Sequence, residues 1–396
     1  MRRPRVVFVS AHPITPDRLQ RGQLSWLQKR GFAVAVVTSP GADLDRLAAR
    51  EGVRVSAIPI ARSPSPLRDV LSFIKLVRHF RRERPDMVVA GTMKGGLLGT
   101  VAARTAGVPV VVYHLRGLRL ETTRGGLRLA LRVSERICTR MADRVLCNSA
   151  SLRDRFVALG LGTAARFAIP GAGSSNGVEA GRFQFDPAFR AEERARRGIP
   201  SSAFVVGFVG RLARDKGILE LVEAFRDLRR LHPQAWLLLL GDAEPTDPLP
   251  EGLLESLRTV EPQCIVTGML PDPSRYYSVI DVLAFPSHRE GFPNAPLEAA
   301  AAGVPTIGAA ATGTVDAILP GITGEIVKVG DSRGLSSVLR QYLNDPKRVK
   351  REGLAAKQRV ERDFKPEVVW EALASELGAL LAAKGLPAPN PEAPAW

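Results

Sequence analysis

The sequence contains few cysteines, few aromatic residues and no long hydrophobic run, and each shortage excludes a class of protein. Its three cysteines, Cys138, Cys147 and Cys264, are odd in number and widely spaced in 396 residues, which argues against a disulfide framework and a zinc site. Aromatic residues make up 6% and no nucleic-acid-reading module is recognised, so we expect no nucleic-acid partner. The apolar stretches fall short of the roughly 18 residues that a membrane span needs. We therefore expect a protein of the reducing cytoplasm that does not cross the membrane.

The basic N-terminus could be mistaken for a signal peptide. Its apolar core, VVFVSA, is shorter than the roughly 7 to 15 residues of such a segment. A buried first strand fits this run better.

Lysine is scarce, with 10 residues against 46 arginines, and the net charge of +16 is unevenly distributed. Residues 1–180 contain 30 Lys and Arg against 12 Asp and Glu, a balance of +18, whereas residues 181–396 contain 26 against 28, a balance of −2. A genome that prefers arginine codons accounts for the abundance of arginine but should affect both halves alike. The asymmetry favours an anionic partner, such as an acidic lipid surface, for the first half.

Short β-branched runs alternate with helical stretches through both halves of the chain, which is typical of βαβ units and a parallel sheet. The pattern restarts at AFVVGFVG, residues 203–210. We predict an α/β protein with two Rossmann-like, doubly wound parallel-sheet domains that face an interdomain cleft. The predicted parts are residues 1–180, residues 181–364, a helix over 365–384 that returns to the first domain, and a disordered tail over 385–396.

One candidate motif, residues 288–303, follows the buried strand DVLAFPS. It reads as a loop that contains Glu290 and then a helix with Asn294 as N-cap and Gly303 beyond its end. The free N–H groups of a helix start can bind a diphosphate, and a carboxylate such as Glu298 can accept hydrogen bonds from ribose. Alternatively, Glu298 only complements the helix dipole and Glu290 is a solvated loop residue.

A second motif lies at the first turn between strand and helix in the second domain. The strand ends at Gly210, and Arg211 and Lys216 flank a short loop before a helix that begins near Gly217. Two cations in such a loop can hold a diphosphate leaving group and neutralise its developing charge. An exposed basic turn is the alternative, but two phosphate-competent loops in one domain make coincidence less plausible.

Together these stretches, GRLARDKGILELVEAF and HREGFPNAPLEAAAAGVP, resemble the donor-domain signature of the family 4 glycosyltransferases, retaining enzymes of the GT-B fold. The resemblance implies that Arg211 and Lys216 bind the donor diphosphate, and that these enzymes usually need no metal. It further implies that Glu298 binds the ribose and that Glu290, with the backbone of 291–294, contacts the sugar and phosphate. The candidate catalytic residues are Glu290, Arg211, Lys216 and His114. The candidate donor-binding residues are Gly210, Arg211, Lys216, Met269, Leu270, Glu290, Gly291, Phe292, Pro293, Asn294, Glu298 and Gly22.

The first half resembles the branch of this family found in capsule and O-antigen assembly, through RGQLSWLQKRGFAVAVVTSPG, GTMKGGLLGTVAARTAGVPVVVYHLRGLRLE and GSSNGVEAGRF. Where much of the family has a Gly-Gly turn, this chain has Arg21-Gly22. The position of the family histidine falls on Arg116, while His114 lies two residues earlier and on the same face of an extended segment. His114 is either a displaced equivalent or a core residue. Arg116 and Lys94 are the candidate acceptor-binding residues.

Two basic helical stretches could meet a membrane. In PLRDVLSFIKLVRHFRRER, Phe73, Leu76 and Phe80 are expected to insert while neighbouring cations meet lipid headgroups. In residues 124–144 arginine recurs every fourth position, so the charged band winds around the helix. Ordinary amphipathic surface helices are the alternative for both.

We therefore expect a retaining, metal-independent glycosyltransferase without a cofactor. It would move a hexose or N-acetylhexosamine from a nucleotide-sugar, UDP-linked, to a polyprenyl-diphosphate-linked or other glycan acceptor in cell-surface polysaccharide synthesis. It would be cytoplasmic and peripheral on the inner face of the plasma membrane. Three readings remain as alternatives: a glycosyltransferase of secondary metabolism, a GT-B epimerase, and a non-catalytic two-domain sugar-binding protein.

Two further classes fit less well. A nicotinamide oxidoreductase would have GxGxxG at its first turn, which SAHPITPDRLQRG lacks. A metal-dependent transferase would use an Asp-x-Asp triplet, and Asp43-Leu44-Asp45 matches it. That triplet opens a helix, where a capping role is more plausible.

Overall fold

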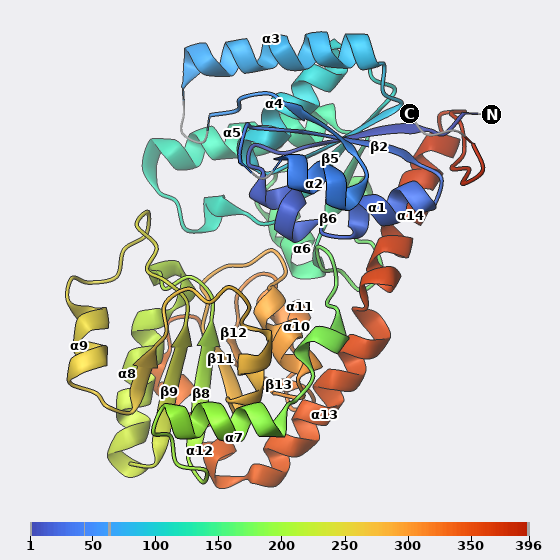
Figure 1. The fold of residues 1–396 in the computed structure, drawn as a ribbon. Coiled ribbons are helices and arrows are strands. Elements are labelled where there is room, and N and C mark those ends of the chain that lie inside the picture. Colours follow the sequence, from blue (N-terminus) through green and yellow to red (C-terminus); the bar gives the residue numbers. More distant parts are fainter. Residues whose placement is uncertain (1, 43, 62–64, 394–396) are drawn as a thin grey trace. The chain divides into compact units, whose positions relative to one another are not determined.

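Two separate parallel sheets organise the chain, as the alternation of strands and helices predicts. The structure, a computed structural model, describes residues 2–42, 44–61 and 65–393. A first unit comprises the residues up to Asn176 together with those from Pro366 onward, and a second unit comprises Gly177–Lys365. Each unit is a sheet surrounded by helices (Figure 1). The predicted α/β class with two doubly wound sheets is confirmed.

The sheet of the first unit has seven parallel strands in the order β3-β2-β1-β4-β5-β6-β7. This order starts in the middle and extends outward on both sides, which defines a doubly wound sheet. The strands are β1 (Arg5–Val9), β2 (Ala33–Thr38), β3 (Arg54–Ala57), β4 (Met87–Gly91), β5 (Val110–Leu115), β6 (Arg144–Cys147) and β7 (Phe167–Ala168). The helices are α1 (Gln23–Lys29), α2 (Leu44–Glu51), α3 (Pro66–Glu83), α4 (Met93–Thr105), α5 (Gly125–Met141), α6 (Ala150–Ala158) and α14 (Pro366–Ala382).

Alternate residues of β1 belong to two different apolar layers. Val6 and Phe8 pack in the layer that contains α1 and α14, whereas Val7 and Val9 pack in the layer that contains α3 and α4. Because both faces of the sheet are covered, the central strands are continuous β-branched runs. The N-terminal VVFV run is therefore a buried strand, as predicted.

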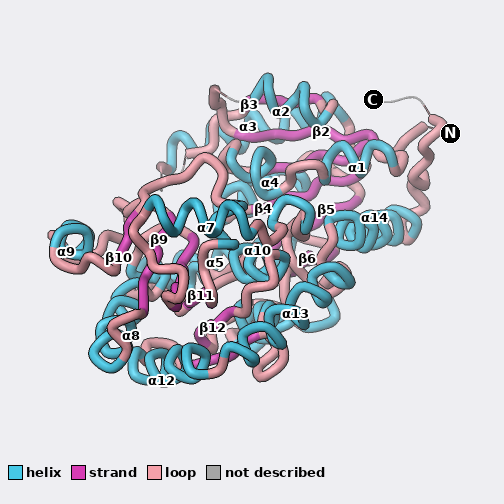
Figure 2. Tube along the Cα trace, turned by 60° about the horizontal axis from the view of Figure 1, so that its bottom comes forward, coloured by secondary structure: helices cyan, strands magenta, loops and turns pink. Residues whose placement is uncertain are grey.

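The second unit repeats this plan with six parallel strands in the order β10-β9-β8-β11-β12-β13. Its strands are β8 (Phe204–Val209), β9 (Ala235–Leu240), β10 (Cys264–Val266), β11 (Val282–Phe285), β12 (Thr306–Ala309) and β13 (Gly324–Val327). Its helices are α7 (Pro187–Arg196), α8 (Ile218–Leu231), α9 (Leu253–Thr259), α10 (Asn294–Ala301), α11 (Thr314–Ala317), α12 (Ser332–Asn344) and α13 (Pro346–Asp363). Figure 2 shows strands of this sheet among their helices. The sheet changes direction between β8 and β11, where doubly wound sheets bind ligands beyond the strands' carboxyl ends.

The C-terminal helix α14 belongs to the first unit. Leu377 and Leu381 pack in the same apolar layer as Leu24 of α1, and Trp370 lies with its ring 5.7 Å from that of Trp26. The unit boundaries fall at 176/177 and 365/366, where the sequence pattern predicts boundaries at 180/181 and 364/365.

Residues 385–393 form neither helix nor strand but make defined contacts with the first unit. The Asn390 N–H donates to the Gly31 carbonyl at 3.2 Å, and the Arg3 guanidinium donates to the Pro391 and Ala393 carbonyls at 2.5 Å. These contacts differ from the disorder expected for the tail, and residues 394–396 lie outside the described residues.

Helix α3 presents to the sheet the same apolar face that was expected to insert into lipid. Leu76 and Phe80 are at most 1% exposed, and Phe73 packs against the same core layer. The prediction that these three residues insert is therefore wrong. The exposed apolar residues of α3 are Leu67, Val70, Leu71 and Ile74.

All three cysteines are buried and free. In the part of the chain that the structure describes, each helix is too short or too polar to span a lipid bilayer.

Candidate functional site

Three loops of the second unit meet beyond the carboxyl ends of β8, β11 and β12. Gly217, which begins α8 with φ +71°, lies so close to the β11 loop that a Cβ would be 2.2 Å from the Pro286 carbonyl oxygen. A Cβ on Gly313, with φ +79°, would lie 2.7 Å from the backbone of Gly291. The Glu290 N–H donates to the Thr312 carbonyl at 3.0 Å. Both glycines permit positive φ and close backbone approach, so the two sequence motifs lie side by side.

Lys216 and Glu290 form the centre of this region. The Lys216 Nζ donates to Glu290 Oε1 at 2.5 Å, and both side chains are only about 15% exposed. The Ser287 hydroxyl donates to the same carboxylate oxygen at 2.9 Å. The structure thus brings together two residues that the sequence placed 74 positions apart.

Further ion pairs hold the same loops. Arg289 donates to Asp215 at 2.9 Å, and the His288 ring lies 2.8 Å from Glu220. The hydrogen bond that the His288 ring donates to Glu220 raises the pKa of His288 above its usual value, with burial opposing. These contacts fix the β11 loop against the β8 loop and α8, which limits the movement of Lys216 and Glu290.

Arg211 pairs with a different carboxylate. Its Nη1 donates to Glu244 Oε2 at 2.6 Å, and the Arg211 side chain is 48% exposed. The Thr246 hydroxyl donates to Glu244 at 2.7 Å and its N–H at 3.2 Å. The Thr246 hydroxyl first, and then Arg211, lower the pKa of Glu244 to about 2. Glu244, which the sequence motifs did not indicate, therefore stays ionised and anchors Arg211 to the loop after β9.

Helix α10 begins at Asn294, one residue earlier than predicted. Pro293 is its N-cap, so Asn294 is the first helical residue and makes no side-chain cap. Gly303 follows the helix with φ +75°, as expected for a glycine beyond a helix end. The prediction of Asn294 as N-cap is wrong because the loop contacts of Glu290 and Gly291 set where the chain enters the helix.

Glu298 lies in the second turn of α10 and is bound by a tyrosine that the motifs did not indicate. The hydroxyl of the fully buried Tyr277 donates to Glu298 Oε2 at 2.6 Å. Burial raises the pKa of Glu298, and the hydrogen bond from Tyr277 opposes this shift. Tyr277 lies in the stretch SRYYS, and nothing in that sequence identifies Glu298 as its partner.

The remaining donor candidates of this unit fall into two groups. Phe292 is 6% exposed and packs against Phe364 with ring centroids 5.3 Å apart, so its side chain belongs to the core. Met269 is 62% exposed and Leu270 is half-buried in the loop after β10. Gly210, with φ +149°, donates its N–H to the Leu240 carbonyl at 3.0 Å and so joins the ends of β8 and β9.

In the first unit, His114 and Arg116 are in contact, as their spacing in a strand predicts. The Arg116 Nη2 lies 3.2 Å from His114 Nδ1, and His114 Nε2 lies 2.9 Å from Asn148 Oδ1. Because a guanidinium only donates, Nδ1 accepts and Nε2 carries the proton that is donated to Asn148. Burial first, and then Arg116, hold the pKa of His114 well below its usual value, so the ring is neutral.

Arg116 is itself held by two partners. It also donates to the Ser175 hydroxyl, and burial lowers its pKa to about 10, so it remains a cation at neutral pH. Lys94 donates to Asp69 Oδ1 at 2.6 Å. Asn148 and Ser175 were not indicated by the motifs.

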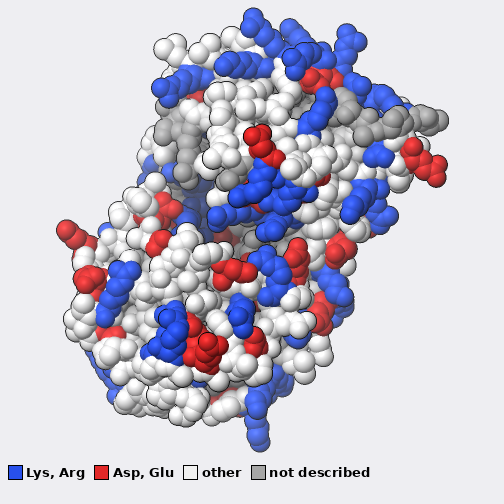
Figure 3. All heavy atoms as spheres, viewed as in Figure 1, with Lys and Arg blue, Asp and Glu red and all other residues white. Residues whose placement is uncertain are grey.

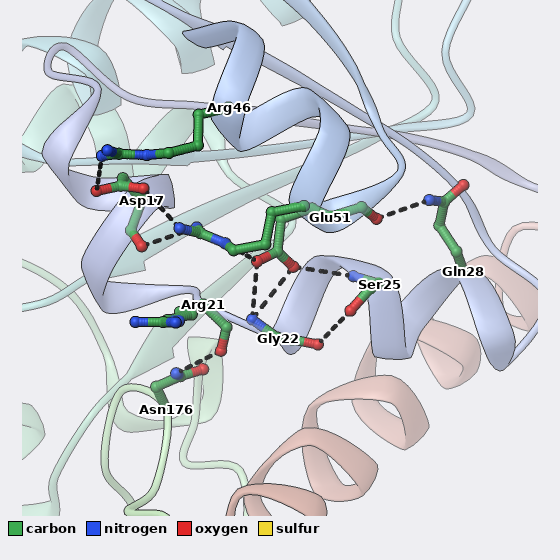
Figure 4. Close-up of polar contacts among 9 residues, drawn as sticks. Asp17, Arg21, Gly22, Ser25, Gln28, Arg46, Glu51 and Asn176 are labelled. Atoms are coloured by element: carbon green, nitrogen blue, oxygen red, sulfur yellow. Dashed lines mark hydrogen bonds and ion pairs between the residues drawn. The ribbon is translucent and has the colours of Figure 1, made fainter. Parts of the chain in front are cut away.

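Gly22 is bound by a carboxylate of its own unit. Its N–H donates to both oxygens of Glu51, at 2.9 and 3.1 Å, and Arg50 donates to the same carboxylate at 3.0 Å (Figure 4). Glu51 is 2% exposed, and Ser25 also donates its N–H to it at 3.3 Å. The structure therefore places Gly22 at a buried carboxylate, and its role in donor binding stays a prediction.

Among the described residues, no group of three or more His, Cys, Asp and Glu side chains is arranged to hold a metal ion. Of the Asp-x-Asp triplet, Asp43 lies outside the described residues and Asp45 lies in the first turn of α2.

Two family models match the chain, one largely within each unit. The model described as "Glycosyl transferase 4-like domain" matches residues 18–172. The model described as "Glycosyl transferases group 1" matches residues 189–359.

Characterised proteins resemble the chain over most of its length. It is 33% identical over 363 residues to the capsular polysaccharide biosynthesis glycosyltransferase CapM of Staphylococcus aureus. The aligned region covers 92% of this chain and 94% of CapM. It is 26% identical over 302 residues to the UDP-Gal:alpha-D-GlcNAc-diphosphoundecaprenol alpha-1,3-galactosyltransferase of Escherichia coli, covering 74% of this chain and 76% of that protein. The fold resembles the crystal structure of Anabaena Alr3699/HepE in complex with UDP-glucose, with a TM-score of 0.78, 21% identity, and 95% and 99% of the two chains covered.

Proposed function

The chain belongs to the family 4 glycosyltransferases of the GT-B fold, of the type found in capsule and O-antigen synthesis, and from this premise we propose a specific transfer reaction. It moves a hexose or N-acetylhexosamine from a UDP-sugar to a lipid-linked or other glycan acceptor, with retention of configuration and without a metal or other cofactor. The observation that carries the proposal is the assembly of Lys216, Glu290 and the start of α10 at the ends of adjacent strands.

The names of two similar proteins support a UDP-linked donor. The Escherichia coli relative is named for UDP-Gal and for a GlcNAc-diphosphoundecaprenol acceptor, and the HepE structure contains UDP-glucose. We infer a nucleotide-sugar of the same kind for this chain and a diphosphate-linked glycan as the acceptor class.

The contacts suggest how each group acts on the donor. Lys216 and Arg211 neutralise the diphosphate, whose negative charge grows as the sugar leaves. They can do so by exchanging part of their bonding from Glu290 and Glu244 to phosphate oxygens, since a lysine has three donors and an arginine five. Glu298, oriented by Tyr277, accepts hydrogen bonds from the ribose.

The remaining roles follow from the resemblance. Glu290 and the backbone of residues 291–294 contact the sugar and phosphate. His114 is the candidate catalytic residue of the first unit, and Arg116 and Lys94 are its acceptor-binding candidates. The neutral His114 ring, with its proton on Nε2, can orient a hydroxyl but cannot supply a positive charge.

Calorimetric titration of the purified protein with UDP, GDP and ADP in EDTA tests the donor site. We expect UDP to bind without metal, and Glu298→Gln to weaken UDP by about 10- to 100-fold, which corresponds to about 1.5–3 kcal/mol for a hydrogen bond to a charged group. Glu352→Gln is the matched control, because Glu352 of α13 also accepts from a buried tyrosine, Tyr342. Equal UDP affinity of Glu298→Gln and wild type would remove the ribose role. Absence of nucleotide binding would favour the non-catalytic sugar-binding alternative.

We also propose that the first unit works at an anionic membrane surface, such as the inner face of the plasma membrane. The exposed apolar residues of α3 lie among the exposed cations Arg68, Lys75 and Arg78, and Lys and Arg side chains gather along this helix (Figure 3). Helix α5 contributes less, because Arg128, Arg132 and Arg136 donate to backbone carbonyls of their own unit. An apolar stripe flanked by cations fits the interface of an acidic bilayer.

Sedimentation with lipid vesicles tests this surface. The wild type is expected to bind vesicles of phosphatidylglycerol and phosphatidylcholine, and added salt should weaken the binding. Leu67 and Leu71 are 83% and 58% exposed, so replacing both by serine should reduce partitioning by about 10- to 100-fold through lost apolar burial. Leu231→Ser, at a position 63% exposed in the second unit, should bind as the wild type does. Equal binding of the double variant and the wild type would exclude α3 as the contact.

A further inference from the structure

A small cavity of about 60 Å³ lies in the first unit beyond the ends of β4 and β5 and beside α5. It is large enough for about two water molecules, or for a small substituent of a ligand. Apolar side chains form one part of its wall and ionisable side chains form another. Its lining includes Met93, Leu120, Leu131, Tyr113, Arg116 and Glu135.

Glu135 is a buried carboxyl group that no cation neutralises in the described part of the chain. It is 6% exposed, and the Tyr113 hydroxyl donates to its Oε2 at 2.8 Å. The arginines on either side of it, Arg132 and Arg136, donate instead to the carbonyls of Leu159 and Gly160. Burial raises the pKa of Glu135 to about 7. A buried carboxyl without a cation partner costs folding free energy and therefore suggests a use other than stability.

Arg116 supplies hydrogen-bond donors to the same cavity. Its bonds to Ser175 and His114 occupy two of its five N–H groups, so others are left for a ligand. The cavity therefore offers a carboxyl acceptor at Glu135, a guanidinium donor at Arg116 and an apolar surface.

The backbone beside the cavity is strained. Thr92, which lines it, has φ +64° and ψ 161°, a conformation that is rare for a β-branched residue. Its hydroxyl accepts from the Ala11 N–H at 3.2 Å, which helps to hold it. Strain of this kind persists where the surrounding structure enforces it and concentrates at functional sites.

We propose that this cavity receives the acetamido group of an N-acetylated acceptor sugar. The amide N–H donates to Glu135, the amide oxygen accepts from Arg116, and the methyl group packs against Met93, Leu120 and Leu131. An acetamido group combines these three features, whereas a hydroxyl group in its place lacks the apolar part. The inference rests on the proposed glycan transfer and adds the acceptor's substituent to it.

The test measures binding of two probes in the presence of saturating UDP: decyl diphosphate carrying N-acetylglucosamine, and decyl diphosphate carrying glucose. We expect the wild type to prefer the acetamido probe by about 10- to 100-fold. Because the cavity is small, a probe with an isobutyramido group in place of acetamido should lose this advantage. Equal affinities for the acetamido and glucose probes, or failure of both to bind, would overturn the proposal.

Two variants locate the preference. Met93 is partly exposed, and Met93→Trp should fill the cavity and abolish the preference for the acetamido probe. Glu135→Gln should reduce this preference by about 10-fold. Met141→Trp on α5 and Glu352→Gln in the second unit are the matched controls and should keep it. UDP affinity should be unchanged in all four, which reports an intact second unit. A preference that survives both cavity variants would place the acetamido group elsewhere and overturn the proposal. If the wild type itself does not bind UDP, the proposed donor is refuted instead.

Discussion

Replacing Lys216 by glutamine is expected to lower the rate of sugar transfer by about 100- to 1,000-fold. In other enzymes, the rate falls by a similar factor when one hydrogen-bond donor that stabilises the charge developing in the transition state is removed. Glutamine removes the positive charge but can still donate to Glu290, so the loop contacts remain. UDP affinity should fall less, by about 10-fold, because the diphosphate gains its full charge only as the sugar leaves. Initial rates with a UDP-sugar and calorimetry with UDP measure the two effects separately.

The matched control for this prediction is Lys347→Gln, at an exposed position at the start of α13, which should transfer sugar at the wild-type rate. A second comparison separates catalysis from structure. If Lys216 served only to neutralise Glu290, the double variant Lys216→Gln/Glu290→Gln would regain both stability and activity. We expect it to regain stability alone. Recovery of transfer in the double variant would contradict the role of Lys216 at the diphosphate.

The fold was predictable because its signal is local and repeated. Strand and helix patterns recur in both halves, and each strand is recognisable from a few β-branched residues, as the buried run at β1 illustrates. Motifs placed after the strands were likewise readable, since parallel strands present their ends at one edge. The Lys216–Glu290 contact then follows from β8 and β11 being neighbours.

Which face of a helix is buried was not predictable for α3. This helix has two apolar stripes, one with Leu76 and Phe80 and another with Leu67 and Leu71. Periodicity identifies both, but only packing against the sheet decides between them. The sequence favoured the stripe with aromatic residues as the exposed one, and the structure places that stripe in the core.

Partners distant in sequence were also beyond prediction. Glu298 and Tyr277 are 21 residues apart, Gly22 and Glu51 are 29 apart, and neither pair follows a helix or strand period. The start of α10 was misplaced by one residue for a related reason. Asn has the stronger intrinsic preference for the N-cap, but contacts between the loops after β11 and β12 fix the backbone there.

Replacing Gly217 by alanine is expected to lower both the stability of the second unit and its affinity for UDP. The positive φ costs alanine about 1–2 kcal/mol, and the clash of a Cβ placed 2.2 Å from the Pro286 carbonyl oxygen adds about 1–3 kcal/mol. For a unit of this size the sum corresponds to a fall of about 5–15 °C in the midpoint of thermal unfolding. Relief of the clash must move the β8 loop away from the β11 loop, which separates Lys216 from Glu290 and weakens UDP binding.

Gly330 isolates the contribution of this close approach. It has nearly the same positive φ, +78°, but its Cβ would meet no atom within 4 Å. Gly330→Ala should therefore lose only the backbone contribution, a few degrees in the unfolding midpoint, and should bind UDP as the wild type does. If the two variants unfolded at the same temperature and bound UDP equally well, the contact between Gly217 and Pro286 would not hold the loop that contains Lys216. If Gly217→Ala is the less stable and also the weaker binder, the same backbone contact both stabilises the unit and positions its lysine.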